Sequence, residues 1–320
     1  MNRLGAMAVL LSVVAFAVTY VCLHGRPLKV RLGWLLAFTL LSIPSLLFAV
    51  YYLHVLPEQA WFYTLRSWTG TEFLVVFLGC ASGAVASLLP RILFPVPLAF
   101  MVVLAAIPYA KQLIAPISDR DLHEVWQGDV CRQSTPSTCG PASVCTILKR
   151  LGGNPSEPVV ARAAFSYAAG TEAWYLARYI RSEGYTARFD FRQTFTPSVG
   201  LPAMVGVRLG SVGHFIAVLE VNGDQVSYGD PGNLARITCF TGTNPEVHLS
   251  GLSGSMIHVS SSGRVSVGLA GVGLTFKAVQ GGRWPGRFRG GEPQDSLSRC
   301  LQTHVTGESS VRKQLSKVSI

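Results

Sequence analysis

The sequence predicts a multi-pass α-helical membrane region followed by an α+β domain. Long apolar runs are confined to residues 1–117 of the 320-residue chain, whereas later residues show the spacing first of amphipathic helices and then of strands. Only 14% of all residues are charged and 49% are hydrophobic, a balance typical of chains with membrane segments. We therefore expect one region embedded in lipid and another exposed to water.

Four apolar runs define the membrane region, and they cover roughly residues 5–24, 33–53, 71–89 and 92–114. Each run approaches the roughly 20 residues that a helix needs to cross a hydrocarbon core of about 30 Å. A soluble fold with four such runs would have almost no polar surface. We therefore expect residues 1–117 to form a four-helix transmembrane region in contact with membrane lipid. The first run lacks small residues at its end, so we expect a retained anchor and not a cleaved signal.

The cations beside these runs bear on orientation, because short cytoplasmic loops are enriched in Lys and Arg. Four crossings place both ends of the region on one side of the membrane. That side carries Arg3, Arg66, Lys111 and Arg120, and the other carries Arg26, Lys29, Arg31 and Arg91. The dense triplet 26–31 in the short first loop favours the cytoplasm for that loop. We expect a multi-pass protein of the bacterial inner membrane whose soluble domain is extracytoplasmic.

The distribution of charge argues against nucleic acid as a partner. The net charge is +10, but residues 121–250 carry 10 Lys/Arg and 11 Asp/Glu, and the excess lies in residues 1–120 and 251–320. A nucleic-acid-binding domain would concentrate basic charge on its folded part. None of the seven cysteines has the CxxC spacing common in zinc sites. We therefore expect neither a nucleic-acid partner nor a cofactor.

Cys139 stands where a polar segment meets a predicted helix. Residues 118–130 are polar and are expected to be a linker, and apolar residues recur at helical spacing from Val144 to Leu151. A helix N-terminus lowers the pKa of a thiol and favours the nucleophilic thiolate. Gly140 would let a substrate approach the backbone. A buried structural cysteine is the alternative interpretation of Cys139.

The following residues predict two helices and then a set of strands. The helices are expected at 157–165 and 171–183. Strands are expected at 186–191, 203–209, 213–221 and 225–229, and Asn222-Gly223 indicates a hairpin between the last two. In that hairpin His214 and Asp230 fall almost opposite each other. A base and the carboxylate that orients it need this placement, although a strand-edge histidine and a turn aspartate would also explain the two residues.

Segment 131–151, the Gly-His-Phe-Ile-Ala-Val of 213–218 and the Tyr-Gly-Asp-Pro of 228–231 resemble the double-glycine leader peptidases. These are bacteriocin-processing cysteine peptidases of papain-like fold, usually found as N-terminal domains of ABC exporters. The resemblance implies an α+β papain-like cysteine peptidase domain over residues 131–249. It implies cleavage of peptide precursors after small residues, and it gives four residues their roles: Cys139 as nucleophile, His214 as base, Asp230 as its partner and Gln133, six residues before Cys139, as the oxyanion donor.

The architecture departs from that family. The domain follows four apolar runs, and the sequence has no GxxxxGK[ST] loop for ATP. The expectation is therefore a membrane-anchored peptidase that acts on a peptide or protein, with a separate ABC-type exporter as a partner. The alternative is an accessory domain that binds peptides for a separate transporter without cutting them. Residues 250–320 leave the family pattern, and we expect extra strands in a Gly/Ser-rich setting followed by a basic, disordered tail.

Overall fold

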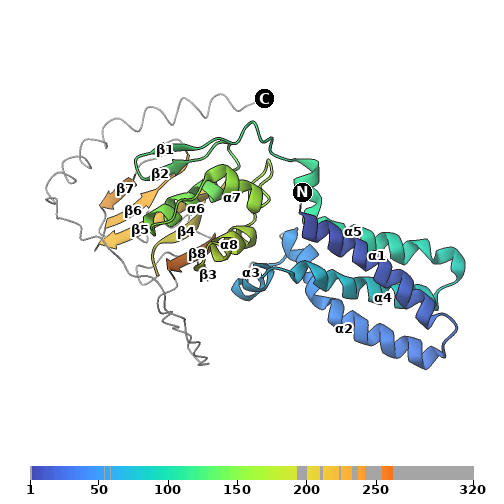
Figure 1. Cartoon of the computed structure of the whole chain (residues 1–320). Coiled ribbons are helices and arrows are strands. Elements are labelled where there is room, and N and C mark those ends of the chain that lie inside the picture. Colours follow the sequence, from blue (N-terminus) through green and yellow to red (C-terminus); the bar gives the residue numbers. More distant parts are fainter. Residues whose placement is uncertain are drawn as a thin grey trace, which may run out of the picture.

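The computed structural model contains a bundle of apolar helices and an α+β domain, joined by one connecting segment (Figure 1). The structure describes residues 2–53, 55–57, 59–192, 200–209, 212–222, 225–232, 237–241 and 254–261. This arrangement confirms the predicted fold class.

The bundle is built from α1 (Arg3–Leu23), α2 (Leu28–Tyr52), α4 (Val75–Leu88) and α5 (Pro95–Ile114). Short 3-10 turns, η1 (Thr71–Leu74) and η2 (Arg91–Leu93), precede α4 and α5. With these turns included, four helices in the described part of the chain are long and apolar enough to cross a membrane. They correspond to the four runs in the sequence, and much of their apolar surface faces outward, as lipid contact requires.

Helices α1 and α4 pack closely because α4 has small residues on the contact face. A side-chain carbon added at Gly79 would lie 2.2 Å from the Ser12 carbonyl oxygen, and one added at Gly83 would lie 2.4 Å from that of Phe16. Neither distance is compatible with a methyl group. The spacing of these glycines therefore lets the two backbones touch, as in other small-xxx-small membrane interfaces.

The α+β domain begins with the hairpin of β1 (Val125–Gln127) and β2 (Val130–Arg132). Three helices follow, α6 (Cys139–Arg150), α7 (Glu157–Ala163) and α8 (Ala173–Ser182). The expected linker 118–130 therefore contains β1, the turn of the hairpin and the first residue of β2. Each of these strands has only three residues, which is too short to give a recognisable sequence pattern. Residues 157–163 and 173–182 are helical as predicted, with slightly shorter limits.

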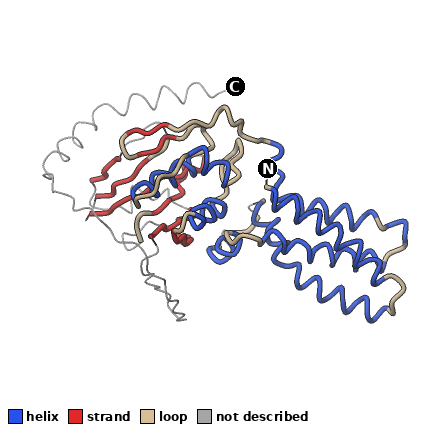
Figure 2. Tube along the Cα trace, in the orientation of Figure 1, coloured by secondary structure: helices blue, strands red, loops and turns tan. Residues whose placement is uncertain are grey.

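A six-stranded antiparallel sheet completes the domain, and its order is β3-β8-β4-β5-β6-β7. The strands are β3 (Tyr185–Arg192), β4 (Ala203–Leu209), β5 (Val212–Asn222), β6 (Gln225–Gly229), β7 (Ile237–Thr241) and β8 (Gly254–Ser261). Figure 2 shows the helices on one face of this sheet. The predicted strands β3 to β6 are confirmed.

The sheet extends beyond the expected domain limit at residue 249. Strand β8 lies between β3 and β4 and pairs with both, so one of the extra strands expected within residues 250–320 belongs to the same sheet. Such long-range pairing leaves no local pattern in a sequence. The other strands expected beyond residue 261, the basic tail, and Gly223 of the predicted turn lie outside the described residues.

Candidate active site

Cys139 is the first residue of α6, as the helical spacing indicated, and its side chain is 7% exposed. The preceding turn is fixed by Thr138, which is buried. Its hydroxyl accepts from the Thr135 backbone N–H at 3.1 Å and donates to the Thr135 carbonyl at 3.1 Å. The first N–H groups of a helix have no partner within the helix, so they present partial positive charge beside Cys139.

His214 and Asp230 meet across the β5–β6 hairpin. His214 Nε2 lies 2.8 Å from Asp230 Oδ1, and the two side chains are 11% and 26% exposed. The Gly232 backbone N–H donates to the same carboxylate oxygen at 2.8 Å. Because Asp230 contacts Nε2, Nδ1 is the ring nitrogen left to face the Cys139 thiol, which helps to raise the pKa of His214.

These contacts shift the pKa of both side chains. Burial is the largest influence on His214 and disfavours its charged form, but the hydrogen bonds and negative charge of Asp230 and Cys139 outweigh it and raise the pKa to about 9. Burial likewise opposes the charge on Asp230. The hydrogen bonds from His214 and Gly232, with the positive imidazole, nevertheless hold the pKa of Asp230 below its usual value. The geometry therefore favours an imidazolium beside a carboxylate at neutral pH.

Ser143 fastens the helix that carries Cys139 to the strand that carries His214. Its hydroxyl donates to the Phe215 carbonyl at 3.0 Å, and Phe215 directly follows His214. Sequence reasoning missed this residue. The available signal was a serine four residues after Cys139, which places both on one face of the helix.

Gln133 lies beside the same site through its backbone. Its N–H donates to the Pro231 carbonyl at 2.9 Å, one residue after Asp230. The side-chain Oε1 is buried and has no hydrogen-bond partner among the described residues. The next residue, Ser134, donates from its backbone N–H at 3.3 Å and from its hydroxyl to the buried carboxylate of Glu157. Glu157 thus holds the Gln133 segment, and the sequence did not reveal this role.

Gly140 does not provide the open backbone that we expected. It is buried, and a side-chain carbon added there would lie 2.7 Å from Leu176 Cδ1 and 3.4 Å from Phe215 Cδ2. The absence of a side chain at Gly140 allows α6 and α8 to pack closely against each other. The expected approach of substrate at this residue is therefore wrong.

Two other cysteines of the domain, Cys131 and Cys145, are fully buried. Burial raises the pKa of the Cys145 thiol, and the adjacent Cys131 thiol raises it further. Both side chains are part of the core around α6. Thiols in such surroundings are expected to be inert.

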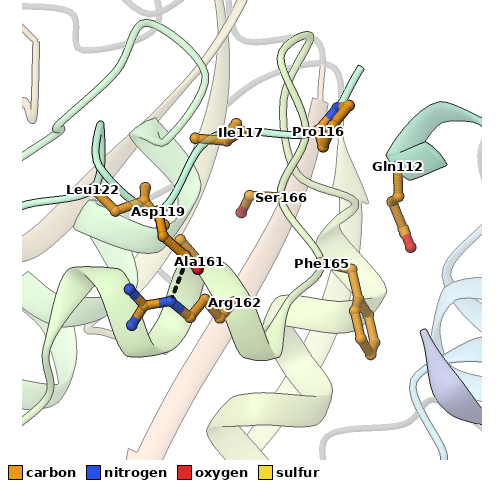
Figure 3. Close-up of a pocket in the computed structure, with 9 residues that line it drawn as sticks. All are labelled: Gln112, Pro116, Ile117, Asp119, Leu122, Ala161, Arg162, Phe165 and Ser166. Carbon is orange, nitrogen blue, oxygen red and sulfur yellow. Dashed lines mark hydrogen bonds and ion pairs between the residues drawn. The ribbon is translucent and has the colours of Figure 1, made fainter. Parts of the chain in front are cut away.

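A cavity of about 330 Å³ lies between the end of α5, the segment that follows it and α7 (Figure 3). Its rim includes the ion pair between Arg162 and Asp119, with a distance of 2.7 Å. Ser166 and Gln112 also line it. Its lining includes none of the four candidate residues, so this cavity is separate from the site around Cys139.

Comparison with known proteins gives matches that each cover less than half of the chain. No protein-family model matches it. Two solved peptidase domains of ComA, from Streptococcus and Streptococcus mutans, cover 43% and 42% of the chain and 98% and 99% of their own lengths. Their sequence identities are 21% and 18%, and their TM-scores are 0.36 and 0.33.

Among curated proteins, the probable functional amyloid protease FapD of Pseudomonas aeruginosa is 28% identical over 112 residues, which are 32% of this chain and 50% of FapD. An uncharacterized protein of Methanothermobacter marburgensis is 31% identical over 108 residues, 32% of this chain and 70% of that protein. A second, from Methanothermobacter thermautotrophicus, is 30% identical over 115 residues, 34% of this chain and 75% of that protein. The chain belongs to the same family as these two archaeal proteins.

Proposed function

We propose that this protein is a membrane-anchored cysteine peptidase. The observation that carries the proposal is the placement of Cys139 at the start of α6, together with a histidine whose Nε2 lies 2.8 Å from Asp230 Oδ1 and whose pKa the Cys139 thiol helps to raise. A nucleophile, a base and a group that orients the base are the parts that covalent catalysis requires. The similarity to FapD, named a probable protease, supports the same reaction class.

The proposed reaction is hydrolysis of a peptide bond in two steps. His214 holds the thiol proton as an imidazolium, and the Cys139 thiolate sulfur attacks the scissile carbonyl carbon. The tetrahedral oxyanion is stabilised by the Gln133 amide and a backbone N–H at the start of α6. Its collapse breaks the C–N bond as the imidazolium donates a proton to the leaving amine. Water, deprotonated by His214, then attacks the thioester, releasing the new carboxylate and restoring the thiol.

The substrates in this proposal are peptide or protein precursors cut after small residues, and a separate ABC-type exporter is the partner. These finer assignments rest on the resemblance of segment 131–151, 213–218 and 228–231 to double-glycine leader peptidases. The rival function is a domain that holds the same peptides without cutting them. An intact set of Cys139, His214 and Asp230 favours cleavage, because binding alone needs none of the three.

The test is single-turnover cleavage of small-residue-rich peptides by the purified chain under reducing conditions. Binding of the same peptides is measured in parallel on the Cys139→Ala protein. A peptidase yields product with wild type and only binding with the variant. If wild type binds tightly and forms no product, the accessory-domain function replaces the peptidase function.

The pH profile of cleavage is expected to carry the signature of the His214 pair. A pKa raised to about 9 means that the imidazolium persists up to that pH and is lost above it. Because the imidazolium protonates the leaving amine, kcat/KM should be maintained through neutral pH and fall above about pH 9. The apparent pKa of this fall at high pH is a property of the coupled Cys139–His214 pair and not of one residue. A fall beginning near pH 6.5, the ordinary pKa of histidine, would contradict the arrangement.

The proposed location is the inner membrane, with the peptidase domain outside the cytoplasm. The bundle end far from the domain exposes three cations, Arg26, Lys29 and Arg91. At the domain end, Arg66 and Lys111 each form an ion pair with a glutamate, and the exposed cations there are Arg3 and Arg120. Loops rich in unpaired cations remain in the cytoplasm. A reporter joined after Ile117 should be active only if it is of the kind that works outside the cytoplasm, and activity of a cytoplasmic reporter would reverse the orientation.

A further inference from the structure

Helix α8 has two faces that contact different parts of the molecule. Four residues spaced three apart, Glu172 just before the helix and Tyr175, Arg178 and Arg181 within it, form one face. Glu172 contacts α5, and the other three contact the stretch from α3 to η1. The opposite side carries fully buried apolar residues such as Leu176 and lies in the domain core. In Figure 1, α8 lies where the α+β domain approaches α3 (Ala60–Arg66) and the bundle.

The polar face of α8 ends in a buried set of charges. Arg178 Nη1 lies 2.7 Å from Glu72 Oε1, and Arg66 Nη1 lies 3.4 Å from the same oxygen. Arg66 Nη2 donates to the Tyr175 hydroxyl at 3.1 Å, and so does Asn2 Nδ2 at 3.2 Å. Glu72 is fully buried and Arg66 is 1% exposed. We call these five residues the junction cluster.

A second contact lies at the start of α8. Lys111, in the last turn of α5, places Nζ 3.1 Å from Glu172 Oε1, and the Tyr167 hydroxyl donates to the same oxygen at 3.1 Å. The Ser137 hydroxyl, two residues before Cys139, donates to the Ala168 carbonyl. The segment that leads into α8 is therefore joined both to a membrane helix and to the turn that precedes Cys139.

The apolar face of α8 touches the helix of the nucleophile. Leu176 lies so close to Gly140 that even a methyl group would not fit between them. Since Gly140 adjoins Cys139, a displacement of α8 would move the first turn of α6 relative to His214. Misplacing a reacting group by about 1 Å can lower a rate by about 10²-fold.

We infer that the membrane region is a functional part of the peptidase, in which Glu72, Arg66 and Lys111 are positioning residues that fix Cys139 through α8. This inference rests on the proposed function. Removing one member of a buried ion pair leaves its partner charged and unpaired, which drives rearrangement. The bundle would then do more than tether the domain, because its ends set the geometry at Cys139.

The experiment compares Glu72→Gln and Lys111→Met with wild type, all as full chains in detergent. Each protein is titrated with a thiol-reactive peptide so that rates refer to intact sites. We expect kcat to fall at least about tenfold with KM changed less than about twofold, and Glu72→Asp to restore part of the loss. Arg150→Gln is the matched control. Arg150 lies on the same helix as Cys139, and the substitution breaks its exposed 3.7 Å ion pair with Glu220 of β5. The kcat of this variant should equal that of wild type.

Two further readouts do not need cleavage. Alkylation of Cys139 at pH 7 should slow about tenfold in Glu72→Gln and stay unchanged in Arg150→Gln. After a site-specific protease cuts a recognition sequence inserted between Arg120 and Asp121, the domain should remain bound to the wild-type bundle and separate in Glu72→Arg. If the wild-type protein never cleaves the peptides, that result overturns the proposed function and not the positioning of Cys139 through α8. Unchanged kcat and alkylation in both folded variants, or separation of the cut wild-type protein, would overturn this inference.

Discussion

Replacing His214 with alanine is expected to abolish cleavage almost as fully as replacing Cys139, with kcat/KM lowered by about 10⁴-fold or more. The variant loses the group that takes the thiol proton and returns it to the leaving amine. It also loses the positive charge that stabilises the thiolate, since Asp230 and Cys139 together raise the pKa of His214 and favour its charged form. The two variants should behave alike because base and nucleophile act as one unit.

Asp230→Asn provides the matched comparison. The amide keeps the shape of the carboxylate but can hold the imidazole in the wrong tautomer, so kcat should fall by about 10⁴-fold, less than in His214→Ala, and measurable activity should remain. Loss of the carboxylate charge should also lower the pKa of His214 and move the alkaline limb of the pH profile below about 9. Single-turnover cleavage measures all three variants. Substantial activity in His214→Ala would exclude His214 as the base.

Gln133→Ala is expected to lower kcat by about 10²–10³-fold, the usual cost of one oxyanion-hole donor. Peptide affinity should hardly change, because the donor acts on charge that develops only in the transition state. The structure favours an effect on turnover without an effect on binding. The side-chain Oε1 of Gln133 has no partner in the described fold, whereas its backbone N–H donates to the Pro231 carbonyl. Truncating the side chain should therefore leave the segment in place.

The control for Gln133 is Gln127→Ala, an exposed glutamine on β1 whose loss should affect neither turnover nor binding. Turnover is measured on the active chain, and affinity on the same substitutions in the Cys139→Ala background. Equal losses in kcat/KM and in affinity for Gln133→Ala would assign this residue to peptide binding and remove it from the oxyanion hole.

Much of the fold could be predicted because its signals are local. The four spans follow from apolar length alone, and β3 to β6 follow from alternation within each strand. The contact between His214 and Asp230 follows from counting residues across one hairpin, since pairing in a hairpin is set by its turn. Gly79 and Gly83 could likewise be assigned to a helix contact from their spacing.

The remaining features depend on contacts between residues far apart in the chain. Strand β8 pairs with β3 across more than sixty residues of sequence, and no local pattern indicates which strands it pairs with. The role of Gly140 depends on which helix packs over it, and Leu176 comes from α8. Arg66 and Glu72 have the sequence pattern of ordinary loop charges, but both are buried and contact Tyr175 and Arg178 of α8, far along the chain.

The most direct test of the central claim is covalent labelling of the purified full-length protein by a peptidyl vinyl sulfone at pH 7, with the adduct located by mass spectrometry. A peptidase with an activated Cys139 predicts one adduct at Cys139, formed well before any at the buried Cys131 or Cys145, and nearly absent in His214→Ala. Labelling that is equal at the three cysteines, or that proceeds at Cys139 equally fast without His214, would contradict it.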